Sequence, residues 1–152
     1  MSKDRNVKAV HCFEMLDAIV KEKDPVRFKK ALQWYGAKSP LNFILSLNFN
    51  HTVKLELPEG MPPLDLKDMD AQTHPDMMGL LAGSIHRVRH CLTSNTTLTK
   101  NKKEGIFYEV LINCPLKDAE ILCSAKDHAL HELYPAITAE AVAEFFPAYV
   151  KS

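Results

Sequence analysis

Residues 104–122, EGIFYEVLINCPLKDAEIL, decide the fold class, because two apolar segments meet there at one proline. Residues 104–114 are apolar on most sides, which predicts a central buried helix, with a buried strand as the alternative. Pro115 ends this element, because proline lacks the amide hydrogen that a helix interior requires. Residues 116–130 carry alanine and leucine on one stripe, with Asp118 near the positive end of the dipole, and predict another helix.

Helical periodicity continues upstream of this stretch. A stripe of apolar side chains predicts a first helix over residues 4–23. Asp24 then supplies an N-cap before a proline and a second helix, which we expect Gly36 to close in the left-handed conformation. The same signal of a cap followed by proline, at Ser39, predicts a short third helix up to about residue 47.

Two further helices complete the prediction. Residues 75–91 carry apolar side chains at helical spacing and predict a long fourth helix, in which Gly83 weakens the helix or lets another helix approach closely. Thr138 precedes a last apolar stripe, and we expect it to cap a short helix that ends at Pro147. The sequence therefore predicts an all-α fold, a compact bundle of six or seven helices.

Length and composition predict a single globular helical domain over residues 1–152. The 19 Lys and Arg residues balance the 19 Asp and Glu residues, which argues against a generically basic nucleic-acid-binding protein. Cys12, Cys114 and Cys123 stand among apolar residues, as small buried side chains do in a reducing compartment. The charged N-terminus and the lack of a long apolar run indicate a chain with neither a cleaved signal peptide nor a membrane helix.

A long loop over residues 51–76 separates the third and fourth predicted helices. Residues 51–57 alternate apolar and polar side chains but have no partner strand, so we expect an extended segment that lies across helices. Residues 58–76 contain four prolines, and residues 56–76 hold six carboxylates against one lysine. Such a loop is uncommon unless it binds something, so this extended proline-rich acidic insertion is the first candidate for a functional surface; a docked linker is the alternative.

We expect residues 57–78 to bind a protein partner. The prolines restrict the backbone before binding, the methionines can repack around different contacts, and the carboxylates would steer a basic surface. The expected partner-binding residues are Glu59, Met61, Pro62, Pro63, Asp65, Asp68 and Asp70.

The alternative function is RNA or DNA binding by the basic region at residues 86–103. Contacts to phosphate require cationic side chains gathered on one face, and this region is the main basic concentration of the sequence. The residues expected to contact nucleic acid are Arg87, Arg89, Lys100, Lys102 and Lys103. A solvated helix end followed by a polar loop would show the same pattern.

Motifs for metal binding and catalysis are missing. His86 and His90 have the spacing of ligands on one helix face, but the sequence has neither C-x-x-C nor H-E-x-x-H, and we expect no metal. No G-x-S-x-G, phosphate-binding loop or dinucleotide-binding fingerprint is present either. We therefore predict a protein that is not an enzyme and needs no cofactor.

Four short motifs resemble those of a family of small uncharacterised proteins of T4-like tailed bacteriophages. The motifs lie at residues 57–63, 117–127, 134–138 and 145–147. The resemblance implies a phage protein in the cytoplasm of the infected host, and it implies no enzymatic activity. It favours an accessory protein that binds a host or phage protein.

Overall fold

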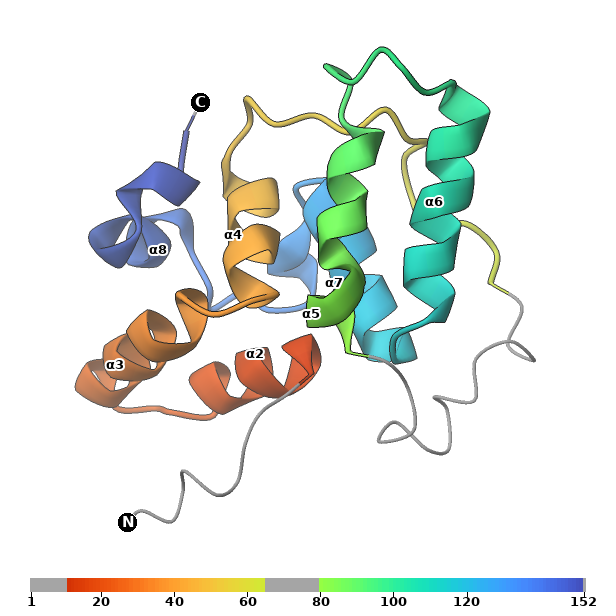
Figure 1. Cartoon of the computed structure of the whole chain (residues 1–152). Coiled ribbons are helices and arrows are strands. Elements are labelled where there is room, and N and C mark those ends of the chain that lie inside the picture. Colours follow the sequence, from red (N-terminus) through yellow and green to blue (C-terminus); the bar gives the residue numbers. More distant parts are fainter. Residues whose placement is uncertain (1–10, 65–79, 152) are drawn as a thin grey trace.

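The computed structural model describes residues 11–64 and 80–151, and the regular secondary structure of this part of the chain is helical (Figure 1). Its seven α-helices are α2 (Cys12–Val20), α3 (Pro25–Gly36), α4 (Leu41–Phe49), α5 (Leu81–Ser84), α6 (Lys100–Ile112), α7 (Leu116–Lys126) and α8 (Ala139–Phe145). Its three 3₁₀ helices are η4 (Ile85–Cys91), η5 (Leu130–Glu132) and η6 (Pro147–Tyr149). In the described residues, β structure is limited to isolated bridges and no strand is formed, so the predicted all-α class is confirmed.

Helix α7 lies at the centre of the fold, where it packs against α2, α4 and α6. Phe107, Val110 and Leu111 of α6 are buried in the same hydrophobic core, but Gly105 and Glu109 are exposed, so α6 buries one face and is not the predicted helix that is buried on most sides. Pro115 separates α6 from α7, as predicted. In the described ranges, no helix has both the length and the apolar character needed to cross a membrane.

The predicted N-caps of α3 and α8 are confirmed. The side chain of Asp24 accepts a hydrogen bond from the backbone of Arg27, and the side chain of Thr138 accepts one from Ala141. Ser39 does not cap the third helix, because α4 begins after Pro40 and has no side-chain cap.

Gly36 has a different role from the one predicted. It is the last residue of α3 instead of a left-handed residue after it, and the following Ala37 has right-handed helical angles. A Cβ atom at Gly36 would lie 2.7 Å from Cε2 of Phe146, so the glycine is needed for close packing and not for a turn.

The predicted fourth helix is helical over residues 81–91, but most of this stretch is a 3₁₀ helix. A single turn of α5 leads into the 3₁₀ helix η4, whose buried residues Ile85, Val88 and Cys91 are three apart. That spacing matches the three residues per turn of a 3₁₀ helix. A Cβ at Gly83 would meet no atom within 4 Å, so no helix approaches closely there. Residues 75–79 of the predicted helix lie outside the described residues.

Helix α2 is the described part of the predicted first helix, and a buried carboxylate of α7 holds its start. The backbone amides of Cys12 and Phe13 donate to the two carboxylate oxygens of Asp118 at 3.1 and 2.8 Å. Because Asp118 is fully buried, desolvation raises the pKa of its carboxyl above the usual value. These bonds satisfy two of the amides that a helix N-terminus leaves without partners.

The prediction that residues 51–57 form one extended segment is correct only in part, because a turn at residues 51–52 and a bend at residues 56–57 flank the short extended part around Leu55. Leu55 forms an isolated antiparallel bridge with Leu92, and the amide of Glu56 donates to the carbonyl of Cys91 at 2.8 Å. Val53 and Leu57 pack against the core. This path brings the proline-rich segment that follows to the side of α6.

Candidate binding groove

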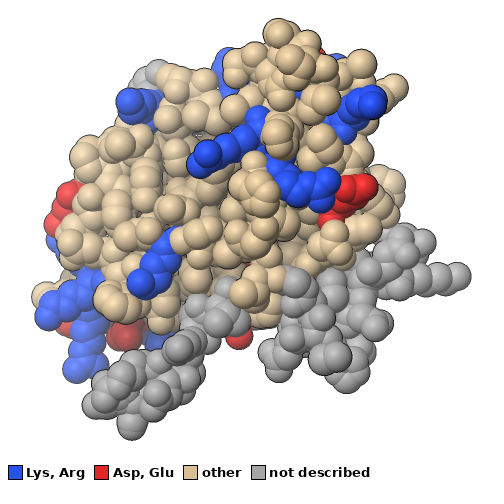
Figure 2. Space-filling view, viewed as in Figure 1, with Lys and Arg blue, Asp and Glu red and all other residues tan. Residues whose placement is uncertain are grey.

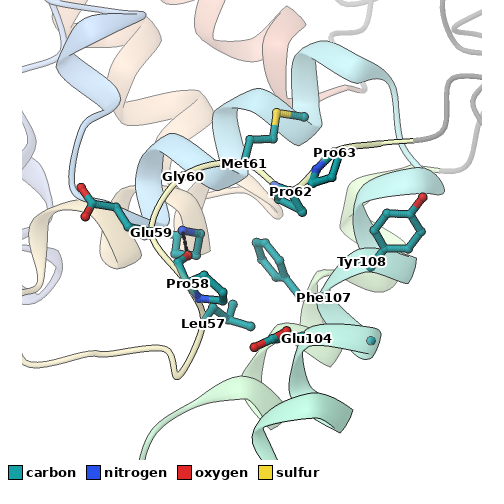
Figure 3. A pocket seen from close by; sticks show the side chains of 12 residues that line it. Leu57, Pro58, Glu59, Gly60, Met61, Pro62, Pro63, Glu104, Phe107 and Tyr108 are labelled. Atoms are coloured by element: carbon teal, nitrogen blue, oxygen red, sulfur yellow. Dashed lines mark hydrogen bonds between the residues drawn. The ribbon is translucent and has the colours of Figure 1, made fainter.

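A groove of about 600 Å³ lies between residues 57–63 and one face of α6, and we call it the 57–63 groove (Figure 3). Figure 3 shows the ring of Phe107 between the proline-rich segment and α6. The volume lies in the range of known ligand-binding clefts. The lining residues are Leu57, Pro58, Glu59, Gly60, Met61, Pro62, Pro63, Glu104, Gly105, Phe107, Tyr108 and Lys126.

Two charged residues at the end of α7 fasten the wall of the groove. The ammonium group of Lys126 donates to the carbonyl of Pro58 at 2.8 Å and to Oδ1 of Asp127 at 2.6 Å. The other oxygen of Asp127 accepts a hydrogen bond from the amide of Gly60 at 2.9 Å. Gly60 has a φ of +86°, a conformation that glycine adopts without steric cost. The segment is therefore held in one conformation at Pro58 and Gly60.

A buried lysine attaches the start of the same segment to α6. Lys103 is 1% exposed, and its ammonium group donates to Glu56, to the carbonyl of Leu92 and to the carbonyl of Asn95 at 2.6, 2.8 and 2.6 Å. The hydrogen bond from Lys103 lowers the pKa of the Glu56 carboxyl. Lys103 thus joins the extended segment, the loop after η4 and α6.

The groove has an acidic rim and an apolar floor. Among its described lining residues, Glu59 and Glu104 carry carboxylates, and Lys126 is the one cation. The charge of Lys126 is already neutralised by Asp127, and its side chain is only 4% exposed. A ligand in the groove therefore meets negative charge at the rim and the side chains of Leu57 and Phe107 beneath it.

The structure brings four of the predicted partner-binding residues together. Glu59, Met61, Pro62 and Pro63 all line the 57–63 groove. The remaining three, Asp65, Asp68 and Asp70, lie outside the described residues. The sequence interpretation did not assign two other parts of the site. These are the opposite wall, with Glu104, Gly105 and Tyr108, and the pair of Lys126 and Asp127, which we call the clamp.

A signal for one of these missed residues is present in the sequence. Lys126 stands at helical spacing from Ala119, Leu122 and Cys123, all of which are buried. A lysine on the buried stripe of a helix needs acceptors, and this position points to a docked segment near the end of α7.

The predicted basic region is smaller than its sequence indicates. Figure 2 shows Lys and Arg side chains gathered on the upper part of the face that η4 and α6 share. Arg89, Lys100 and Lys102 are exposed, whereas Arg87 donates to Glu109 at 2.7 Å. Lys103 is buried and fully engaged, so the prediction that it contacts nucleic acid is wrong.

All four cysteines are buried and free, as predicted for Cys12, Cys114 and Cys123. Burial raises the pKa of the Cys91 thiol to about 11 and that of Cys123 to about 12. Thiols with such raised pKa values are poor nucleophiles at neutral pH, because the thiolate is the reactive form.

Comparison with known proteins identified one family. The model of DUF6433, described as a family of unknown function, matches residues 15–132, which include the whole 57–63 groove and its clamp. No curated protein and no solved structure matches the chain.

Proposed function

The chain belongs to the DUF6433 family, and we propose that it is a non-enzymatic accessory protein that binds a partner protein in the 57–63 groove. The observation that carries this proposal is the clamp formed by Lys126 and Asp127, which holds Pro58 and Gly60 in place through hydrogen bonds within the protein itself. A surface ordered before binding loses less conformational entropy when the partner arrives.

The occupant that fits best is an extended segment of a protein. The wall of the groove is a proline-rich segment, and the floor is apolar at Phe107, so the groove offers a contact with a hydrophobic centre. Met61 is 37% exposed at the rim, and its flexible thioether side chain can adjust to the shape of a bound side chain. Asp65, Asp68 and Asp70 belong to the same proposed partner-binding segment and lie outside the described residues.

The partner in this proposal is a host or phage protein, met in the host cytoplasm. The support is the resemblance of two motifs, at residues 57–63 and 117–127, to proteins of tailed phages. These motifs contact each other through Lys126 and Asp127.

Binding of RNA or DNA through residues 86–103 is the second candidate. Its support is the group of exposed cations at Arg89, Lys100 and Lys102. Arg87 and Lys103 already pair with groups of the protein, so fewer cations are left to contact phosphate. Both the affinity for nucleic acid and its dependence on salt increase with the number of such contacts. Retention on heparin at low salt, lost on replacement of Lys100 and Lys102 by alanine, is the result that this candidate requires.

Site-specific photo-cross-linking tests the leading proposal. A photoreactive residue at position 61, on the groove rim, is expected to cross-link a protein from infected or host cells, and nuclease treatment should not reduce the yield. The matched control is position 26, because Val26 is 59% exposed on α3 and lies away from the groove. Equal cross-linking to the same proteins from both positions would refute binding in the groove.

A further inference from the structure

We infer that the 57–63 groove continues as an acidic track along α7, and that the track binds a partner segment rich in lysine or arginine. This inference rests on the proposed function and specifies the chemistry of the partner. A second hollow of about 320 Å³ shares Gly60 and Met61 with the groove. A third, of about 260 Å³, shares Glu120 and Leu133 with the second. The three hollows therefore adjoin one another.

The carboxylates along the track differ in what they already bind. Asp127 is occupied by Lys126 and Gly60, and Asp17 accepts a hydrogen bond from Tyr134 at 3.0 Å. The exposed carboxylates of Glu120 and Glu132, in contrast, form no hydrogen bond or ion pair with another residue of the described ranges. Together with Glu59 and Glu104 in the groove, they supply negative charge that no residue of the described ranges pairs with. The 57–63 groove and the second hollow thus favour a cationic ligand.

Cations of the protein do not offset this charge in the second hollow. Its described lining contains no lysine or arginine. Lys117 lines the third hollow, and its ammonium group lies 5.3 Å from the centre of the Phe13 ring. An acidic partner segment would face repulsion along the whole second hollow, and so would a nucleic acid.

Exposed apolar side chains lie among these carboxylates. Met61 and Leu133 are 37% and 43% exposed, and both line the second hollow. The long stems of lysine and arginine pack on apolar surface while their charged groups reach outward. A partner segment that alternates lysine or arginine with apolar residues can therefore pack on Met61 and Leu133 while its charged groups reach Glu120 and Glu132.

Selection from a random peptide library displayed on yeast, with the full chain as the bait, tests this inference. Enriched peptides are expected to carry lysine or arginine together with apolar residues. A synthetic copy of the most enriched peptide is then titrated against two double variants with the same change of net charge. E120Q/E132Q alters the track, and E140Q/E144Q alters α8, which lines none of the three hollows.

Loss of affinity by roughly three- to tenfold in E120Q/E132Q, with no change in E140Q/E144Q, would support the inference, since each exposed ion pair contributes little alone. Equal loss in both variants would overturn it, because binding would then follow net charge. Enriched peptides that lack basic residues but bind the groove would overturn the acidic track and leave the proposed function standing. Failure to enrich any peptide that depends on the groove would overturn both.

Discussion

Oδ2 of Asp127 and the amide nitrogen of Gly60 lie 2.9 Å apart, although 67 positions separate the two residues. This hydrogen bond, with that from Lys126 to Pro58, ties the wall of the 57–63 groove to the C-terminal end of α7. The shape of the groove therefore depends on a charged pair that lies outside the proline-rich segment.

Replacing Asp127 by alanine should destabilise the protein and weaken binding. The Asp127→Ala variant leaves the ammonium group of Lys126, which is 4% exposed, without its counter-ion, and it removes the acceptor of the Gly60 amide. We expect a loss of about 1.5–3 kcal/mol in the free energy of unfolding, measured by urea denaturation. The control is Glu59→Ala, an exposed carboxylate next to Gly60, which should change stability by no more than about 0.5 kcal/mol. Equal effects of the two variants would contradict the clamp.

Truncation of two neighbouring lysines to alanine should have different effects on the stability of the protein. Lys103→Ala removes three hydrogen bonds from a buried ammonium group, and we expect the free energy of unfolding to fall by about 2–3 kcal/mol. Lys102→Ala changes an exposed side chain and should alter stability by less than about 0.5 kcal/mol. Thermal or urea denaturation of both variants measures these effects. An unchanged free energy of unfolding in Lys103→Ala would show that the buried lysine does not join the elements as described.

The buried carboxyl of Asp118 should make stability depend on pH in a defined direction. Burial raises its pKa in the folded state above the unfolded value of about 3.9, so the folded protein holds the proton more tightly. That contribution is complete below about pH 4 and is lost as the pH rises through the raised pKa. Relative to Asp118→Asn, which does not titrate, the wild type should therefore lose stability as the pH rises from about 4 through the raised pKa of the Asp118 carboxyl. Parallel stability curves for the two proteins over this range would refute the raised pKa.

Local signals predicted much of the fold. Asp24 and Thr138 cap helices at the predicted positions, because an N-cap depends on the residues within one turn. The apolar run of residues 104–114 predicted the helix α6 for a similar reason, although it did not show that only one face of this helix is buried. The spacing of apolar residues is a weaker signal in short elements. Ile85, Val88 and the residues around them fit both the 3.6 residues per turn of an α-helix and the 3.0 of a 3₁₀ helix, and the chain forms the 3₁₀ helix.

The sequence predicted only one wall of the groove, since contacts distant in the chain build the other. Residues 58–63 were recognisable by their prolines, but their position beside α6 depends on Lys103 and Lys126. Both lysines lie on buried helical stripes, Lys103 four residues before Phe107, yet Glu56 and Pro58, the acceptors that attach the segment to the helices, are far away in sequence. A basic run such as residues 100–103 does not by itself show which lysine is buried.

Binding by the 57–63 groove is tested most directly by filling it from α6. Gly105 lines the groove, and a Cβ there would meet no atom within 4 Å, so a side chain can start at this position, and Gly105→Leu adds bulk at the groove and favours the helix by about 0.8 kcal/mol. Gly83→Leu is the matched control, because Gly83 also has open space around it but does not line the groove. The measurement is the yield of partner cross-linking from position 61 in each background, with thermal stability recorded alongside. We predict that Gly105→Leu keeps or raises the melting temperature and lowers the yield at least tenfold, whereas Gly83→Leu leaves the yield unchanged. A yield from Gly105→Leu equal to that of the wild type would contradict the groove as the binding site.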